Sequence, residues 1–539
     1  MSVPASARPV ADTDVKRLER EEAEAIAIYR CLFPDDDLDF TFWQGKDPVW
    51  GAPLVVNDRM TFHPHHLRPE YLGRLRLPAG HAGVGMRSIN LSVPRAPLPG
   101  ETANIEAPWQ PVRRLRALFR MWPMAYEHLR YQVEMRRRRL RRKRHSHQSL
   151  PSSDGSPALP PLAVSGPDIA QRPAILIGFH WLEVGGAEKL AFDCVNWALT
   201  AGLRVIVVAS VPSFQRLADR LPDHPDIQFI RLDRYLAHEL WPQYIERLAH
   251  AENIRLIHIH HCVPLYAALA HLRVTTPWIK VVDSTHIVEN ADGGYPRLSG
   301  VWSNYIDHHH VISRELVDYY RDNFYIMHNI HLGRMLERIE EITLPDLNMS
   351  AGQKHLHVAF IGRMHYQKRP VVLVETLRAL SRWAKRNGIE LTATIVGEGA
   401  FADTVSMLLK RYNLTQQVAQ EPANSDIPAL LRKSDILLLP SNNEGLALVC
   451  YEAIQYGCIP ISTDVGAQAE LIPPELLLSL EPFSAVRSAV SVVDNLWREK
   501  EFLVRQQAEL HERFRKIAAD PTAEEVLMPI YRAAAESQS

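Results

Sequence analysis

The sequence has 539 residues, of which 46% are apolar and 23% are charged, and its formal net charge is −1 at pH 7. This composition is ordinary for a soluble globular protein of two or three domains. No apolar run reaches about eighteen residues, the N-terminus has no apolar signal core, and the five cysteines form no Cys-x-x-Cys pair. These features argue against a membrane-spanning helix, a disulfide framework and a zinc site, and they predict a cytoplasmic location.

Residues 1–112 are predicted to be an N-terminal extension whose fold the sequence does not reveal. After a helical, acidic start they mix prolines, glycines and aromatic residues, with neither the period of a strand nor that of a helix. Four aspartates could be taken for a metal site, but they follow Pro34 with no apolar strand leading into them: Asp35, Asp36, Asp37 and Asp39. We therefore expect a solvated turn there.

Residues 113–144 are strongly basic, with thirteen Arg or Lys and two Glu. Apolar residues recur among the arginines at helical spacing, and Pro123 is expected to divide the stretch into two helices. Such a segment can lie on an anionic membrane surface at the inner face of the membrane, or pack on the following domain with a solvated basic tail. Both interpretations stay open. Nucleic acid is not expected as a partner, because no recognised reader module accompanies the charge.

Residues 145–170 are rich in Ser, Pro and Gly and are predicted to be a linker. Alternating strands and helices begin just after it, with a buried strand at Ala174–Phe179 and a loop that contains Gly185 and Gly186. A helix and a second strand follow, so the unit is βαβ and the sheet should be parallel. Paired glycines before a helix let backbone N–H groups and the helix dipole hold an anion such as a diphosphate.

The alternation continues to about residue 345, with later strands expected near 254–259, 278–282 and 306–312. His286 follows one of these strands, at the carboxyl edge where open α/β sheets bind ligands. The cluster His260–Cys262 is not expected to hold a metal, because adjacent residues of a strand end point to opposite faces. Residues 171–345 are therefore predicted to form one Rossmann-like domain.

A second α/β region covers residues 346–485, and helices follow over residues 486–539, with the last one expected to cross back to the first sheet. Its first strand leads into a loop with Arg363 and Lys368, two cations that can converge on one anionic group. A later strand ends at a tight turn that contains Gly397. This region is predicted to be a second Rossmann-like domain.

The most informative stretch of this second region lies between residues 435 and 461. A buried strand is followed by a loop with Glu444 and by a helix over Ala447–Tyr456, which Gly457 ends. The only charged residue of that helix is Glu452. Its carboxylate should be partly desolvated and in need of hydrogen-bond donors, which a ligand with paired hydroxyls would supply.

The order of these segments, from Ala174 to Ile472, resembles that of the retaining glycosyltransferases of the B-type fold, family 4 (glycosyltransferases group 1). The resemblance implies an α/β fold of two facing Rossmann-like domains, with the acceptor on the first and the nucleotide sugar on the second. It implies catalytic roles for four residues: Glu444, His286, Arg363 and Lys368. It implies donor-binding roles for Gly185, Gly186, Arg363, Lys368, Gly397, Glu444, Gly445, Leu446 and Glu452.

The function expected from this resemblance is transfer of a sugar from a nucleoside-diphosphate sugar to a glycan or lipid-linked acceptor, with retention of the anomeric configuration. A role in cell-envelope or polysaccharide biosynthesis is expected, with no cofactor and no metal. Two alternatives remain open: an inactive scaffold that still binds a nucleotide sugar, and another enzyme on a similar two-domain fold, such as an epimerase or a phosphorylase.

Overall fold

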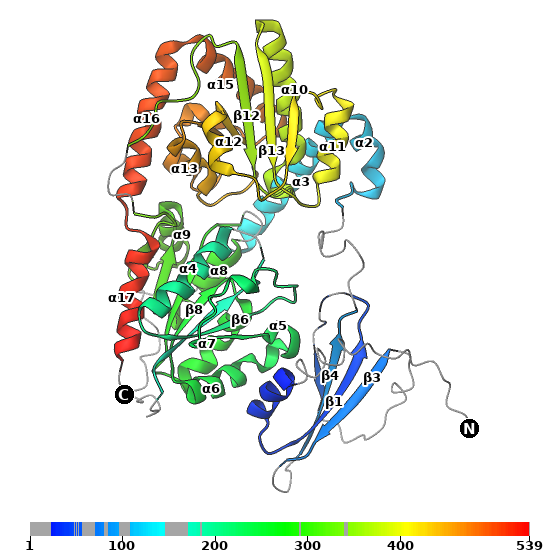
Figure 1. Cartoon of the computed structure of the whole chain (residues 1–539), viewed down its shortest axis with the longest axis vertical. Helices are drawn as coiled ribbons and strands as arrows, with labels where there is room; N and C mark the ends of the chain where they lie inside the picture. The colour runs from blue at the N-terminus through cyan, green and yellow to red at the C-terminus, as the bar shows by residue number, and fades with distance from the viewer. Residues whose placement is uncertain are drawn as a thin grey trace, which may run out of the picture.

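The computed structural model describes residues 23–145, with gaps at 48, 50, 52, 57–69, 80–84 and 96–107, and residues 171–537, with gaps at 184–185, 290–292 and 339–342. The predicted linker falls almost wholly outside these residues. The described residues contain a four-stranded, a seven-stranded and a six-stranded sheet. Figure 1 shows the two larger sheets in separate α/β domains, one above the other, with the small sheet beside the lower domain.

The small sheet belongs to the N-terminal extension. Its strand order is β2-β4-β1-β3, with β1 antiparallel to β3 and parallel to β4. A helix over residues 23–32 precedes it and lies against the first α/β domain, where the Tyr29 hydroxyl donates to the Tyr235 carbonyl at 2.7 Å. The strands are β1 (Asp37–Gln44), β2 (Leu54–Val56), β3 (Tyr71–Leu77) and β4 (Met86–Val93).

The prediction of a solvated aspartate turn is wrong for most of the cluster. Asp37 begins β1, and Asp39 lies inside that strand with only 3% of its surface exposed. Arginines on the two flanking strands neutralise the carboxylates in the pairs Asp36–Arg87, Asp37–Arg76 and Asp39–Arg74. A short strand that begins with acidic residues has no apolar signature at its start, which is why the pattern indicated a turn.

The first α/β domain contains a parallel sheet of order β11-β10-β9-β8-β5-β6-β7. All residues of β5 and β8 are buried, as expected of strands covered on both faces. The strand predicted at 278–282 begins later, because a turn brings the Ile279 N–H to the Thr276 carbonyl. The strands are β5 (Ala174–Phe179), β6 (Arg204–Ala209), β7 (Ile227–Ile230), β8 (Ile254–His260), β9 (Lys280–Thr285), β10 (His308–Val311) and β11 (Ile330–Leu332).

Helices cover both faces of this sheet. One face packs against α4 and α17 in a core that includes Ile177, Val195 and Leu527. The other face packs against α6, α7 and the helix over residues 23–32. The helices are α4 (Gly186–Thr200), α5 (Leu232–Tyr235), α6 (Trp241–Glu252), α7 (Val263–Thr275), α8 (Gly294–Val301), α9 (Arg314–Phe324) and α17 (Ala523–Glu536).

The second α/β domain contains a parallel sheet of order β14-β13-β12-β15-β16-β17. Its strands are β12 (His355–Ile361), β13 (Glu390–Val396), β14 (Val418–Glu421), β15 (Ile436–Leu439), β16 (Ile459–Thr463) and β17 (Leu477–Leu478). Its helices are α10 (Pro370–Asn387), α11 (Ala402–Arg411), α12 (Ile427–Lys433), α13 (Leu448–Gln455), α14 (Gln468–Leu471), α15 (Pro482–Arg498) and α16 (Lys500–Ala519). As expected, α13 is a short helix with Gly457 just beyond its end at φ +74°.

The basic segment packs on this second domain. Pro123 separates α2 (Arg116–Met121) from α3 (Pro123–His145), as predicted. Phe119 and Tyr126 are buried in the core of the second domain, and Trp109 stacks on Phe401 with ring centroids 4.4 Å apart. The structure thus shows the packed arrangement, and Figure 1 shows α2 and α3 beside α10 and α11. In the part of the chain that the structure describes, no helix has both the length and the apolar character needed to cross a membrane.

Two features tie the α/β domains together. The last helix, α17, returns to the first sheet as predicted (red in Figure 1), and the Tyr531 hydroxyl lies 2.6 Å from the Nδ1 atom of His258. At the crossing between domains, Arg334 is 1% exposed and donates to Asp520 and Glu470, both at 2.7 Å. A buried arginine with two carboxylate partners is expected to hold the orientation of the two domains.

Candidate functional site

The loops that follow the parallel strands gather most of the predicted site residues. Loops after β5 and β9 belong to the first domain, and loops after β12, β13 and β15 to the second. In open α/β sheets, ligands bind at the carboxyl ends of the strands. The geometry of these loops therefore decides which of the predicted residues can act together.

Lys368 and Glu444 form a direct ion pair. The Lys368 Nζ lies 2.6 Å from the Glu444 Oε1, and the two side chains are 17% and 7% exposed. Lys368 ends a 3₁₀ turn (Tyr366–Lys368) after β12, and Glu444 follows β15. Charges this far from bulk water interact strongly, so the pair sets the electrostatic character of the site.

The loop of Glu444 touches the first domain. A Cβ atom at Gly445 would lie 2.1 Å from the His286 carbonyl oxygen, and one at Gly466 would lie 1.8 Å from the Glu444 carbonyl oxygen. These approaches are too short for any side chain, so both positions require glycine. Glu444 therefore lies in a loop held between Gly466 of its own domain and His286 of the other.

His286 is buried, and the Nε2 atom of its ring is shielded from solvent. Its Nδ1 lies 3.2 Å from the Met335 sulfur, and its Nε2 has no hydrogen-bond partner among the described residues. Burial holds the pKa of the imidazole well below its usual value, so the ring is neutral at pH 7. A neutral ring can donate or accept one hydrogen bond through Nε2.

The loop after β12 rests on the loop after β13. Gly397 has φ +136°, and a Cβ atom there would lie 2.1 Å from the Gly362 carbonyl oxygen. The Met364 N–H donates to the Glu398 carbonyl at 2.7 Å. Gly397 therefore shapes the loop that carries both predicted cations, by allowing the two backbones to meet.

Arg363 is exposed, and its charge reaches the first domain. Burial raises the pKa of the Glu188 carboxyl at the start of α4, and Arg363 is among the groups that oppose this shift. The Trp181 indole N–H also donates to Glu188, at 2.9 Å. Arg363 of the second domain thus acts electrostatically on Glu188 of α4 in the first domain.

The remaining predicted donor residues occupy different positions. Burial raises the pKa of the Glu452 carboxyl on α13, as expected of partial desolvation, and Lys189 of α4 opposes it. Leu446 is 6% exposed and packs in the core of the second domain. Gly186 is the first residue of α4, and Gly185 lies outside the described residues. The roles of these residues in binding stay predictions.

His286 lies among rings to which the sequence analysis gave no part in the site. His261 stacks on Tyr295 with centroids 4.0 Å apart and ring planes within 5°, and it meets His286 edge to face at 5.1 Å. The Tyr295 hydroxyl lies 3.2 Å from the His180 Nδ1. The three histidines follow β5, β8 and β9, Tyr295 lies in α8, and only the fold brings them together. His261 has φ +58°, in the left-handed region of the backbone.

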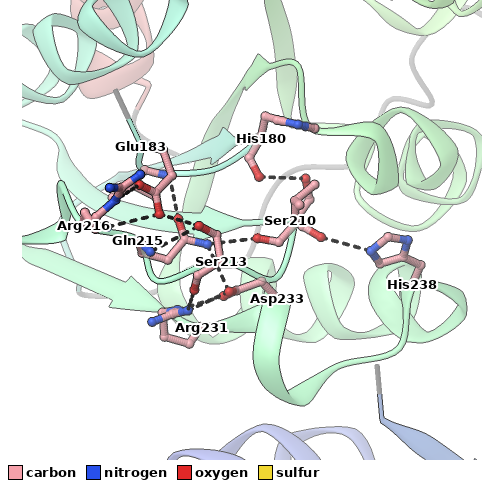
Figure 2. Close-up of polar contacts among 11 residues, drawn as sticks. His180, Glu183, Ser210, Ser213, Gln215, Arg216, Arg231, Asp233 and His238 are labelled. Carbon is pink, nitrogen blue, oxygen red and sulfur yellow. Dashed lines mark hydrogen bonds and ion pairs between the residues drawn. The ribbon is translucent and has the colours of Figure 1, made fainter. Parts of the chain in front are cut away.

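Figure 2 shows a polar network that fixes the loop after β5, which leads to the predicted Gly-Gly turn. Glu183 is buried, accepts from Ser213, and pairs with Arg216 at 2.7 Å. The Leu182 N–H donates to the Gln215 side chain at 2.5 Å, and Gln215 donates in turn to Asp233 at 3.0 Å. Asp233 also accepts two hydrogen bonds from Arg231, at 2.8 and 2.7 Å. The network thus anchors the start of this loop to two neighbouring segments.

A group of possible metal ligands lies beneath this edge of the sheet. The donor atoms of Cys194, His258 and His260 are all buried and lie within 4.8 Å of one another. Both ring nitrogens of His258 already have partners, the Tyr531 hydroxyl at 2.6 Å and the Ser284 hydroxyl at 2.8 Å. A metal would have to displace one of them, so we assign no metal to the site.

Two family models match the chain. The model described as Glycosyltransferase Family 4 matches residues 184–332, and the model described as Glycosyl transferases group 1 matches residues 350–518. Together they cover more than half of the chain. The first match contains His286 and the second contains Lys368 and Glu444, so the residues that the geometry brings together come from both.

Similar proteins are distant. A D-inositol 3-phosphate glycosyltransferase of Salinispora arenicola is 33% identical over 116 residues, which are 20% of this chain and 26% of that protein. The N-acetyl-alpha-D-glucosaminyl L-malate synthase of Bacillus anthracis is 24% identical over 276 residues, 46% of this chain and 69% of that protein. The first curated relatives are matched over only 26%, 48% and 30% of their own length. A solved glycosyltransferase structure from Rickettsia africae, with 14% identity, covers 69% of this chain and 100% of its own, with a TM-score of 0.49.

Proposed function

The chain belongs to the group 1 glycosyltransferases of the B-type fold, and on that premise we propose that it transfers a sugar from a nucleoside-diphosphate sugar to a hydroxyl group of a glycan or lipid-linked acceptor. We further propose that the anomeric configuration is retained and that the product serves cell-envelope or polysaccharide biosynthesis. The observation that carries the proposal is the Lys368–Glu444 ion pair, in which Glu444 lies in a loop that contacts His286 of the other domain.

Three side chains can divide the electrostatic work of this reaction. Breaking the bond to the anomeric carbon leaves negative charge on the diphosphate and positive charge on the sugar ring, so the site needs cations on one side and a carboxylate on the other. Lys368, with Arg363 nearby in the same loop, supplies the positive charge for the diphosphate. Glu444 orients the sugar through its hydroxyls, and the backbone of His286 supports its loop from the first domain, where the His286 carbonyl oxygen meets Gly445.

Nucleotide binding tests this proposal. We expect that one of uridine, guanosine and adenosine diphosphate, or one of their common sugar conjugates, binds the wild type in calorimetry, and that Lys368→Ala weakens this binding about a hundredfold. The exposed Lys385 offers a matched control, because Lys385→Ala removes a lysine of the same domain away from the loop after β12.

The outcomes separate the proposed function from its alternatives. A nucleotide bound by wild type and Lys385→Ala but not by Lys368→Ala supports the donor site. Sugar turnover without an acceptor would indicate an epimerase, and a requirement for free phosphate a phosphorylase. No binding to the folded wild type contradicts the proposal. Proton NMR of the first product decides retention from the coupling of its anomeric proton.

We also propose that the basic segment 113–144 contacts an anionic membrane surface, where the protein would meet a lipid-linked acceptor. Met121 and Trp122 are 56% and 63% exposed between the two basic helices, although their neighbours Phe119 and Tyr126 are buried. Apolar side chains among arginines are the composition of an interfacial contact. If the acceptor is soluble, the exposed Met121 and Trp122 need not contact a membrane.

Vesicle sedimentation tests the membrane contact. We expect binding to phosphatidylglycerol vesicles and not to phosphatidylcholine vesicles. Each arginine near the surface contributes on the order of 1 kcal/mol, so the triple change of Arg113, Arg114 and Arg120 to Gln should weaken binding about a hundredfold. Equal sedimentation of wild type and variant would remove the membrane from the proposal.

A further inference from the structure

The loop that carries Lys368 is contacted by helix α3, which precedes both α/β domains in the chain. Helix α3 lies against α10 and α15 of the second domain. Met124 is buried against Val372 and Ala485, and His128 pairs with Glu481 at 2.7 Å. These contacts place the middle of α3 next to the 3₁₀ turn that ends in Lys368.

Tyr366, the first residue of that turn, contacts two side chains of α3. Its hydroxyl donates to the Glu134 Oε2 at 2.5 Å. The Arg130 guanidinium lies over its ring, 3.2 Å from the centroid. A charge-assisted hydrogen bond and a cation–π contact on one side chain restrict both the position and the tilt of the ring.

The three residues of the turn each make a different contact, so movement of one is transmitted to the others. Tyr366 contacts α3, Gln367 accepts from the Asn442 N–H at 2.8 Å, and Lys368 binds Glu444. The next residue, Arg369, has φ +50° and is 3% exposed. In a turn this short the positions of the first and third residues are coupled through the backbone. By holding Tyr366, α3 therefore restricts the position of Lys368.

The charges of α3 agree with this arrangement. The basic segment 113–144 has only two acidic residues, Glu127 and Glu134, and both face the second domain. Glu127 is 3% exposed, and burial raises the pKa of its carboxyl, against the opposing charges of Arg130 and Arg369. Both acidic residues of the segment thus lie where α3 meets the second domain, beside Arg130.

We propose that Arg130 and Glu134 are positioning residues of the donor site, which act through Tyr366 to place the Lys368 ammonium for a nucleoside diphosphate. The proposal rests on the donor site proposed above. It goes beyond that site, because it gives helix α3 a role in nucleotide binding. No residue of α3 is required to touch the ligand.

Binding of nucleoside diphosphate to the full-length chain tests this role. We expect Glu134→Leu, Arg130→Met and Tyr366→Phe each to raise the dissociation constant about five- to tenfold. Glu134→Gln should stay within about twofold of wild type, because its amide oxygen still accepts the tyrosine hydroxyl. Arg137→Gln, an exposed change on the same helix, is the matched control and should bind like wild type.

A double-mutant cycle separates positioning from a merely structural effect. If Glu134 acts through Lys368, Glu134→Leu should change nothing further in the Lys368→Ala background, measured with nucleotide up to millimolar concentration. An equal further loss in that background would overturn the proposal, as would wild-type affinity of Glu134→Leu alone. A wild-type chain that binds no nucleotide would instead remove the donor site itself, and this inference with it.

Discussion

Glu444→Gln and Lys368→Ala should each lower kcat by about 10²–10³, because each removes a charge that stabilises the transition state more than the ground state. The two residues are 76 positions apart in the sequence and only 2.6 Å apart in the structure. Glu444→Gln keeps the shape of the side chain and removes only its charge, so its effect measures the electrostatic contribution most directly. The measurement is steady-state turnover of the nucleotide sugar identified by calorimetry.

The fold should survive both substitutions, with an unequal loss of stability. Lys368→Ala leaves a buried carboxylate without its partner, which is expected to lower the free energy of unfolding by about 1–3 kcal/mol. Glu444→Gln leaves a lysine that reaches solvent more easily, with 17% of its side chain exposed, and should lower it less. Matched controls are Lys385→Ala and Glu475→Gln, both exposed in the same domain. Undiminished turnover in Glu444→Gln would refute its role.

The free energy of unfolding should fall as the pH drops below about 6.5, because five histidines near the carboxyl edge of the first sheet are buried. Burial lowers the pKa of all five, to about 3 for His261 and to about 4 for His310. The others are His258, His260 and His286. A histidine whose folded pKa is depressed contributes nothing above its unfolded pKa. Below that value the unfolded state alone binds the proton, and stability is lost until the folded pKa is reached.

The loss should be about 1.4 kcal/mol per pH unit for each such histidine, so His261 and His310 together lower the free energy of unfolding by about 4 kcal/mol at pH 5. Buried acids oppose this, since burial raises the pKa of Glu315 to about 7 and its carboxyl favours the folded state as the pH falls. Substituting one histidine separates its contribution from the total pH-dependent change in the free energy of unfolding. Urea unfolding of His261→Asn should lose about 2 kcal/mol less than wild type between pH 7 and pH 5.

Asn suits this position because it tolerates the left-handed backbone of residue 261, at φ +58°. The control is His328→Asn, at an exposed position, which should follow the wild-type curve. If wild type and His261→Asn lose the same stability between the two pH values, His261 is not held neutral by burial.

Strands and helices with a strong local signature could be predicted from the sequence. Ala174–Phe179 matches β5 residue for residue, because a continuous apolar run with clear end signals needs no distant partner to be recognised. Pro123 begins α3 and so limits α2, and Gly457 follows the end of α13, for local steric reasons as well. The positions of His286 and Glu444 after their strands follow from the same local patterns.

Tertiary structure decided the features that depend on residues far apart in the chain. The sheet of the N-terminal extension has strands whose aspartates are neutralised by arginines of neighbouring strands, and no local period records such pairs. The amphipathic pattern of residues 113–144 allowed a membrane or a protein partner, and only the packing of Phe119 in α2 and Tyr126 in α3 shows which side meets protein.

The order of the segments along the chain was enough to indicate the family and the loops that carry the chemistry, because local apolar patterns define strands and their ends. The sequence could not show that Lys368 pairs with Glu444, that Gly445 rests on His286, or that Glu134 holds Tyr366. Each of these contacts joins segments that come together only when the sheets stack and the N-terminal helix docks. Their geometry is therefore a property of the packed molecule, set by which side chains are excluded from water together.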